Sequence, residues 1–313
     1  MIKRQNILNI SGGKDSAALY LHALEQQIPF RAVFADTGNE HELTYDFIRA
    51  LPRRTGGPPI EWVRADFSLQ IMNKREFIQQ DMRADGWRLA DKLRAMAGLY
   101  PTELPFLDLC LWKGCFPTTH RRFCSEQLKH LVIYSQVLEP LLEQNLEVFS
   151  WQGIRAEESR KRATLPLIDK DPKGGELYNY RPLLYWSVHQ VFEIHRRHNL
   201  EPNPLYKKGM ARVGCMPCIH STKDEIRNIA ARFPEHIRKI ERWEQAVRLV
   251  SKFNNATFFP MDKTPGKHQA DKTIPIPDIN QVVAWSKTSR GGRQYLLFPA
   301  PESGCSSQYG LCE

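Results

Sequence analysis

A six-residue segment near the N-terminus, Ser11-Gly12-Gly13-Lys14-Asp15-Ser16, has the composition of an anion-binding loop. It follows an apolar run at 7–10 and opens a helical pattern that continues to about Glu25. Glycines let the backbone approach a ligand, and the free N–H groups of a helix N-terminus attract phosphate. The spacing matches neither the dinucleotide-binding nor the Walker-type glycine motif. We therefore predict a phosphate site here; the alternative is a tight turn that uses its glycines for geometry only.

Two further polar residues follow apolar runs that are typical of strands. Asp36 comes directly after the run 30–35, and Arg155 follows the run 146–151 and Gly153. Side chains at the carboxyl ends of parallel strands meet where α/β sheets bind ligands. We expect Arg155 to bind a phosphate bidentately. For Asp36 we expect a contact with Mg²⁺ or a ribose, with a turn or helix-capping role as the alternative.

The chain has seven cysteines, and two of them form the pair Cys215-Met216-Pro217-Cys218. Such a pair supplies two thiolates and needs two more ligands to close a metal site. Spacing alone does not decide between Zn²⁺ and a [4Fe–4S] cluster, because both accept four thiolates. Cys110 and Cys115 are expected to be buried small hydrophobic residues, with a persulfide carrier as the less favoured alternative.

Short apolar runs alternate with helical patterns in the first half of the chain, which predicts an α/β fold: a twisted parallel sheet with helices on both faces. Capping boxes at Ser187 and Thr222 predict helices that reach about 198 and 250. We place a boundary near 200, between a nucleotide-binding domain (1–200) and a helical, loop-rich region (201–313). The predicted strands are 7–10, 30–35, 60–65, 146–151 and a last one at 294–298. The other predicted helices are 14–25, 42–51, 68–98 and 122–144. The segments 52–59 and 99–118 are predicted to be irregular.

Composition describes a globular protein: 42% of the 313 residues are hydrophobic and 25% are charged. No apolar run approaches the roughly 18 residues that a membrane-spanning helix needs, and the N-terminus lacks the pattern of a secretory signal. We therefore expect a cytoplasmic protein with no membrane partner, whose cysteines are kept reduced. The net charge of +9 favours a polyanionic partner such as nucleic acid.

Five segments together resemble the pyrophosphate-loop ATP pyrophosphatases, a group within the superfamily of the phosphoadenosine phosphosulfate (PAPS) reductases and other adenine nucleotide alpha-hydrolase-like proteins. The resemblance covers residues 7 to about 225. The segments are the loop at 11–16; Asp36-Thr37-Gly38-Asn39-Glu40 with Thr44; Arg122-Phe123-Cys124-Ser125 with Leu128-Lys129; Gly153-Ile154-Arg155 with Glu158-Ser159 and Arg162; and Gly214-Cys215-Met216-Pro217-Cys218.

Members of this superfamily that cleave ATP keep the Ser-Gly-Gly-Lys-Asp-Ser loop, whereas PAPS reductases usually carry a degenerate one. The reductases also end in a Glu-Cys-Gly-(Leu/Ile)-His motif, while this chain ends Tyr309-Gly310-Leu311-Cys312-Glu313. The motifs are most similar to those of the ATP pyrophosphatase of DNA phosphorothioation. The resemblance implies that Lys14, Asp15 and Arg155 are catalytic, and that the nucleotide is bound by Ser11, Gly12, Gly13, Lys14, Asp15, Ser16, Asp36, Thr37, Gly38, Gly153 and Arg155.

The same resemblance implies that the cysteines hold a [4Fe–4S] cluster, with Zn²⁺ as the alternative and a redox pair after that. It makes Cys124 the third ligand beside Cys215 and Cys218. For the fourth ligand Cys305 is the first choice and Cys312 the second.

We expect an enzyme that uses ATP and Mg²⁺ to adenylylate an acceptor, releasing pyrophosphate, after which a sulfur nucleophile displaces AMP. Nucleic acid is the favoured acceptor, and a cysteine desulfurase is the expected sulfur donor. The first alternative is a PAPS or adenosine phosphosulfate reductase. The second is a non-enzymatic module that binds nucleotide, zinc and nucleic acid.

Overall fold

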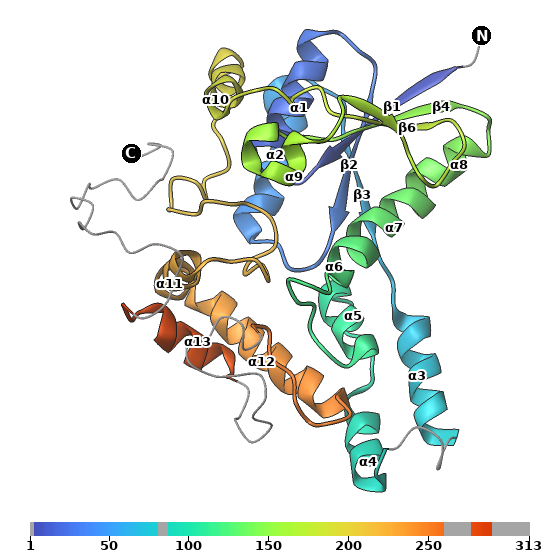
Figure 1. The fold of residues 1–313 in the computed structure, drawn as a ribbon, viewed down its shortest axis with the longest axis vertical. Coiled ribbons are helices and arrows are strands. Elements are labelled where there is room, and N and C mark those ends of the chain that lie inside the picture. Colours follow the sequence, from blue (N-terminus) through green and yellow to red (C-terminus); the bar gives the residue numbers. More distant parts are fainter. Residues whose placement is uncertain (1–2, 81–86, 260–276, 290–313) are drawn as a thin grey trace.

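The fold is built around a six-stranded sheet with the strand order β3-β2-β1-β4-β6-β5. The computed structural model describes residues 3–80, 87–259 and 277–289. All neighbouring strands are parallel except β5, which pairs with β6 in the antiparallel direction at one edge (Figure 1). The predicted parallel sheet is confirmed; β5 and β6, which are short, were not predicted. The strands are β1 (Arg4–Ile10), β2 (Arg31–Asp36), β3 (Ile60–Arg64), β4 (Glu147–Trp151), β5 (Ile168–Lys170) and β6 (Leu177–Tyr180).

Helices cover both faces of the sheet, as predicted. Strand β1 shows why: Leu8 and Ile10 are buried in the core beneath one set of helices, while Ile7 is buried in the core on the opposite face. This alternation follows from the two-residue period of a strand. The first face is covered by α1 (Lys14–Glu25), α2 (Glu42–Thr55) and α10 (Val188–Arg197).

The second face is covered by one long helical segment over residues 123–142, close to the predicted helix at 122–144. It is not a regular α-helix, because two π-helical stretches interrupt it. Such local widening is frequent at functional sites, and both stretches contribute to the cavity described below. In chain order the segment consists of α6 (Phe123–Ser125), η1 (Glu126–His130), α7 (Leu131–Ile133), η2 (Tyr134–Leu138) and α8 (Glu139–Leu142).

A second core lies beyond the carboxyl edge of the sheet and is made of helices from distant parts of the chain. In Figure 1, α3 and α4 extend away from the sheet, and α12 runs alongside α5. The apolar residues of 67–116 and 205–259 share this core, so the C-terminal helices pack directly on an insertion between β3 and β4. The helices are α3 (Ser68–Gln80), α4 (Leu89–Gly98), α5 (Pro105–Lys113), α11 (Lys223–Arg232), α12 (Pro234–Val250) and α13 (Ile279–Ser286).

Three local predictions differ from the structure. The segment 99–118 was predicted to be irregular but contains α5, because Pro105 occupies the first turn, where the missing N–H costs nothing, and Gly114 ends the helix with φ of +69°. The predicted loop 52–59 begins too early, since α2 continues through Pro52 to Thr55. The predicted helix 68–98 is represented by two helices, α3 and α4.

Both predicted capping boxes are confirmed. The Ser187 hydroxyl accepts the Gln190 N–H at 3.2 Å, and the Thr222 hydroxyl accepts the Glu225 N–H at 3.2 Å. The predicted strand 294–298, Cys305 and Cys312 lie outside the described residues. Within the described ranges, no helix combines the length and apolar character required to cross a bilayer.

Candidate functional site

The phosphate loop lies between β1 and α1. Gly12 has φ of +74°, and a Cβ atom there would lie 2.6 Å from Thr44 Cγ2, so this position requires glycine for both conformation and space. The Ser16 hydroxyl accepts the Ser11 N–H at 3.1 Å and donates to the Gly13 carbonyl at 3.0 Å. The loop is therefore folded back on the first turn of α1, whose N-terminus is the positive end of the helix dipole.

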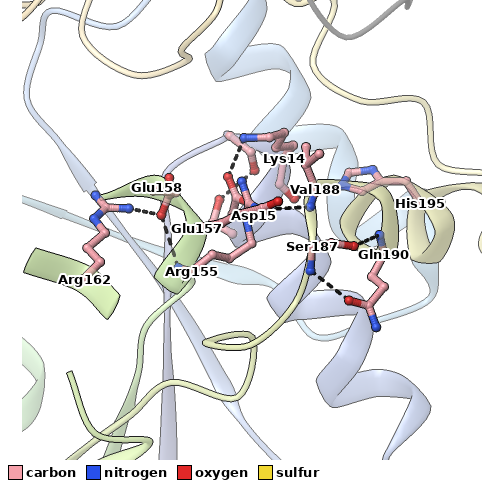
Figure 2. Close-up of polar contacts among 12 residues, drawn as sticks. Lys14, Asp15, Arg155, Glu157, Glu158, Arg162, Ser187, Val188, Gln190 and His195 are labelled. Carbon is pink, nitrogen blue, oxygen red and sulfur yellow. Dashed lines mark hydrogen bonds and ion pairs between the residues drawn. The ribbon is translucent and has the colours of Figure 1, made fainter. Parts of the chain in front are cut away.

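Three predicted catalytic residues meet at this loop. Asp15 accepts from Lys14 Nζ at 2.8 Å through one carboxylate oxygen and from Arg155 Nε at 2.6 Å through the other (Figure 2). Lys14 is 5% exposed and Arg155 is 4% exposed. Burial alone would lower the pKa of Arg155, but the Asp15 carboxylate and two neighbouring glutamates raise it above its ordinary value. Lys14 and Arg155 are thus held in place by one carboxylate.

The approach of the segment after β4 to the loop depends on Gly153. A Cβ atom at this position would lie 3.1 Å from both the carbonyl carbon and the carbonyl oxygen of Asp15. Arg155 follows as the N-cap of the short helix η3 (Ala156–Glu158). Glu157 pairs with the Arg155 guanidinium and also accepts the Val188 N–H at 2.9 Å, which ties this segment to α10 (Figure 2). Glu157 was not singled out from the sequence.

Asp36 and the two residues after it form a turn at the end of β2. Its Oδ1 accepts the Gly38 N–H at 2.9 Å and the Tyr45 hydroxyl at 2.7 Å. Thr37 Oγ1 donates to the Glu40 carboxylate at 2.8 Å. Gly38 has φ of +73° and lies against Pro105, so the turn also contacts α5. The turn role that was considered for Asp36 is therefore present in the structure.

A cavity of about 440 Å³ opens at the carboxyl ends of β1 and β4. These strands are adjacent in the sheet. The chain continues from β1 to β2 on one side of this pair and from β4 to β5 and β6 on the other side, so the strand order reverses between β1 and β4. Such a topological switch point is where α/β sheets bind ligands. Of the predicted nucleotide-binding residues, Ser11 lines this cavity, and Lys14, Asp15 and Arg155 are not among its lining residues. Other lining residues are Asn9, Ser150, Gln152 and Asn179 from the sheet side, and Lys129, His130, Ile133, Tyr134 and Leu138 from the long helical segment.

Residues of α10 and of the segment after it cover the loop. Sequence reasoning missed these contacts. The Tyr206 hydroxyl accepts the Lys14 N–H at 3.0 Å, and Asn203 Nδ2 donates to the Gly12 carbonyl at 3.1 Å. His195 Nε2 lies 2.9 Å from the Lys14 carbonyl, and burial lowers the pKa of this imidazole. One of the amides at the helix start is therefore occupied by a tyrosine of the chain itself. No sequence motif marks these residues.

The cysteine pair lies beside the turn that follows β2. Residues 214–218 are held there by two backbone-directed bonds: Met216 N–H donates to the Asn39 carbonyl at 2.7 Å, and Asn39 Nδ2 donates to the Pro217 carbonyl at 3.1 Å. The peptide bond between Met216 and Pro217 is cis. Cys215 Sγ lies 3.4 Å from Thr37 Oγ1 and 3.6 Å from Glu40 Oε1.

Electrostatic interactions connect the predicted metal ligands to one another. Cys218 interacts electrostatically with both Cys124 and Cys215, so the three lie in one region, although their sulfur atoms are not all within 4.8 Å of one another. Burial raises the pKa of Cys215 to about 12, although Lys129 opposes this, and burial also raises the pKa of Cys124. Burial therefore favours the neutral thiols over the thiolates, and a bound metal would have to displace the proton.

Lys129 lies between the cysteines and the larger cavity. It lines the cavity of about 440 Å³ and also a second cavity of about 100 Å³ that Cys215 and Cys218 line. The neighbouring Cys215 raises the pKa of Lys129, so its ammonium stays charged. This lysine was noted only as part of a motif, and its position between the two cavities comes from the structure.

The remaining cysteines have different surroundings. Cys110 is fully buried in the second core, and burial raises the pKa of its thiol well above the usual value, which agrees with the prediction of a small hydrophobic residue. Cys115 is partly exposed. Cys305 and its alternative Cys312 lie outside the described residues.

Residues 5–221 match the model of the phosphoadenosine phosphosulfate reductase domain. A 37.8 kDa protein in the gpa 5′ region of Escherichia phage 186 is 42% identical over 98% of this chain and 96% of its own length. The adenosine 5′-phosphosulfate reductase of Allochromatium vinosum is 40% identical over 26% of this chain and 32% of its own length.

Among solved structures, a PAPS reductase from Candida auris in a phosphate complex has a TM-score of 0.37 at 16% identity, covering 67% of this chain and 81% of that one. FMN adenylyltransferase of Candida glabrata in complex with ATP has a TM-score of 0.36 at 16% identity, covering 70% and 54%. The family model spans more than half of the sequence and includes the phosphate loop, Arg155 and the cysteine pair. This chain therefore belongs to the phosphoadenosine phosphosulfate reductase domain family.

Proposed function

We propose that this protein binds ATP at the Ser11–Ser16 loop, cleaves it to AMP and pyrophosphate, and thereby adenylylates an acceptor. The observation that carries the proposal is the pair of buried cations, Lys14 and Arg155, held by Asp15 at the start of α1. Ser11 of the same loop lines a cavity of about 440 Å³, within the size range of small-ligand sites. Glycines in contact with the loop and an N-terminal helix dipole add to the support.

In the proposed reaction an acceptor oxygen attacks the α-phosphorus. The bond to the oxygen that bridges the α and β phosphorus atoms breaks, and pyrophosphate leaves with that electron pair. Negative charge therefore collects at the α–β bridge, where preorganised cations stabilise the transition state most. Lys14 and Arg155 are the cations in position for this role. In a second step the outer sulfur of a persulfide, supplied by a cysteine desulfurase, attacks the adenylylated atom of the acceptor, and AMP leaves with the acceptor oxygen. A thiol reductant then cleaves the resulting disulfide and leaves the sulfur on the acceptor.

Mg²⁺ would neutralise the leaving pyrophosphate. Both oxygens of Asp15 are already engaged by cations, so this carboxylate is poorly suited to hold the ion. Asp36 is better suited, because its Oδ1 is engaged by Gly38 and Tyr45 while Oδ2 has only a 3.8 Å approach of Arg64 Nε among the described residues. We expect the nucleotide phosphates to supply most of the ligands, as is usual for Mg²⁺.

Nucleic acid is the acceptor class that fits the net charge of +9. Phosphate contacts of this kind release counterions, so affinity should fall steeply with salt. Filter binding of labelled single- and double-stranded DNA and RNA at about 50 and 200 mM salt tests this: a loss of roughly 10³-fold is expected for six or more phosphate contacts. No binding at low salt would exclude nucleic acid as the acceptor.

A thiolate-bound group fits the region of Cys124, Cys215 and Cys218, where Lys129 and Arg212 supply positive charge beside the smaller cavity. We propose a [4Fe–4S] cluster with Cys305 as the fourth ligand, and Zn²⁺ as the alternative. When bound, the group would complete the packing of the turn that carries Cys215. Lys129 would then lie between this group and the nucleotide.

The rival function is a sulfonucleotide reductase, which the family model and the named reductase relatives favour. Incubation with ATP, PAPS and adenosine phosphosulfate in parallel separates the two functions, with pyrophosphate and AMP measured against sulfite. Lys14→Ala should abolish pyrophosphate release from ATP while the circular dichroism spectrum stays unchanged. Sulfite release without pyrophosphate release would establish the rival, and unchanged ATP turnover in Lys14→Ala would exclude the loop as the site.

A further inference from the structure

A second set of metal-donor side chains lies apart from the cysteines, where α2 meets α12. It consists of His41, Glu42 and His236, whose donor atoms all lie within 4.8 Å of one another. Glu42 Oε2 is 3.6 Å from His41 Nδ1 and 3.4 Å from His236 Nε2. Two ligands of one tetrahedral zinc ion are about 3.4 Å apart when each is 2.0–2.2 Å from the metal. The carboxylate is therefore already at ligand spacing from both imidazoles.

His236 leaves an unused lone pair beside this carboxylate, whereas the Nδ1 lone pair of His41 is engaged by the chain itself. His236 Nδ1 lies 3.1 Å from the Met216 carbonyl, so Nδ1 carries the proton and Nε2 keeps its lone pair. His236 is 3% exposed, and its Nε2 makes no hydrogen bond within the described residues. His41 Nδ1 accepts the Leu43 N–H at 3.0 Å, so it too is unprotonated. Three acceptor atoms therefore lie within 4.8 Å of one another, an arrangement that a shared cation would stabilise.

The surroundings do not supply that positive charge. Burial lowers the pKa of both His41 and His236, so the rings are neutral at neutral pH. The charged groups that act on them are the carboxylates of Glu42 and Glu235 and the ammonium of Lys239, whose own pKa burial lowers to about 8. Two carboxylates against one ammonium leave a net negative field around two neutral imidazoles.

We propose that His41, Glu42 and His236 form a binding site for a divalent transition-metal ion of the Zn²⁺ class. Two imidazoles and a carboxylate are a common zinc donor set, and a ligating histidine usually donates its other N–H to a carbonyl, as His236 does to Met216. The two rings are now stacked, with centroids 4.8 Å apart and planes at 13°. Parallel rings do not direct both lone pairs to one point, so loading turns the His41 ring and replaces its bond to the Leu43 N–H.

The ion would join two segments that are far apart in the sequence. His41 follows the turn after β2 and precedes α2, and His236 lies in the first turn of α12. Asn39, two residues before His41, is bonded to the cysteine turn at Met216 and Pro217. A metal at this site would therefore fasten the C-terminal helices to the nucleotide-binding half next to the cysteines. The proposal does not depend on which reaction the enzyme performs.

The test is a Co²⁺ titration of the purified full-length protein, followed by the visible d–d absorption of the bound ion. We expect a single saturable site that Zn²⁺ displaces and that lacks the intense sulfur-to-cobalt charge-transfer band of thiolate coordination. His236→Gln and Glu42→Gln should each weaken binding by at least about tenfold. The Glu42 side chain is 77% exposed, so its substitution leaves the core intact. His198→Gln, at a histidine that pairs with Glu25 elsewhere, is the matched control and should bind normally.

A second measurement keeps the proposal open to refutation if His236→Gln fails to fold. Zn²⁺ should raise the thermal unfolding midpoint of the unmodified protein and of His198→Gln, but not of Glu42→Gln. Equal Co²⁺ affinity in Glu42→Gln and the unmodified protein would overturn the site. So would the loss of all Co²⁺ absorption in Cys218→Ser, because the ion would then be bound by the cysteines and not by the histidines.

Discussion

The guanidinium of Arg155 donates from Nε to Asp15 Oδ1 at 2.6 Å, although 140 positions separate the two residues in the chain. Arg155 follows β4 and Asp15 follows β1, and these strands are parallel neighbours, so their carboxyl ends place the two side chains together. Lys14 engages the other oxygen of the same carboxylate. Asp15 therefore sets the distance between the two cations that we assign to the phosphates.

Removing the Arg155 guanidinium should strongly impair ATP cleavage. In Arg155→Ala, Asp15 and Glu157 lose a buried partner and the leaving pyrophosphate loses a cation; we expect turnover to fall by roughly 10²–10³-fold, as for the loss of one preorganised donor. Arg155→Lys keeps the charge but not the fork geometry, so it should restore only part of the rate. Pyrophosphate release measures the effect. Arg162→Ala, which removes a more exposed cation paired with Glu158, is the control and should retain most of the activity.

Enlarging Gly153 should push the segment after β4 away from the loop. The new methyl group of Gly153→Ala would meet the Asp15 carbonyl at 3.1 Å, and such overpacking costs about 1–3 kcal/mol of unfolding free energy. Urea denaturation measures the stability, and the Michaelis constant for ATP should rise with it. Gly174→Ala separates space from backbone conformation, because that position is open but has φ of +86°. Unchanged stability and Michaelis constant in Gly153→Ala would contradict the close approach.

How far the sequence predicts this structure depends on how local the signals are. The loop, β1 to β4 and both capping boxes follow from residues within one short segment, so they were predicted. Helix α5 was missed because Pro105 and Gly114 mark its two ends, and both residue types also occur in irregular segments. Tyr206 contacts Lys14 although 192 positions separate them in the chain, and no sequence pattern predicts this contact. Long-range contacts of single side chains are set by packing, which the local sequence does not encode.

The Tyr206 hydroxyl competes with phosphate for the Lys14 amide. We expect Tyr206→Phe to bind a non-hydrolysable ATP analogue more tightly, by up to about tenfold, because a neutral hydrogen bond contributes roughly 1 kcal/mol. Isothermal titration calorimetry measures the affinity. Tyr178→Phe removes a hydroxyl that contacts Glu176 and should bind like the unmodified protein. Weaker binding in Tyr206→Phe would show that the tyrosine helps to hold the nucleotide.

A lysine in the second core should make stability depend on pH. Burial lowers the pKa of Lys74 to about 8, while its ammonium donates to the Leu111 and Trp112 carbonyls near the end of α5. The unfolded chain holds this proton up to its ordinary pKa near 10.5, so between these values the unfolded state binds more protons and stability rises with pH. The contribution of Lys74 to the free energy of unfolding is fully present above the pKa of the unfolded chain, and it is lost as the pH falls through about 8. Denaturation of the unmodified protein and Lys74→Met from pH 7.5 to about 10.5 should show a slope that the variant lacks.

The cysteines divide into those that should matter for metal content and those that should not. Cys124→Ser and Cys218→Ser each remove a thiol from the region around Lys129, so anaerobically purified variants should lose most of their iron and acid-labile sulfide, or their zinc. Cys110→Ala removes a fully buried thiol that lines neither cavity, and it should keep the full content. Cys305→Ser tests the fourth ligand, with Cys312→Ser beside it. Elemental analysis distinguishes iron from zinc. Cys218 belongs to the pair that lines the smaller cavity, and Cys110 does not. Equal metal content in Cys218→Ser and Cys110→Ala would therefore rule out the thiolate site.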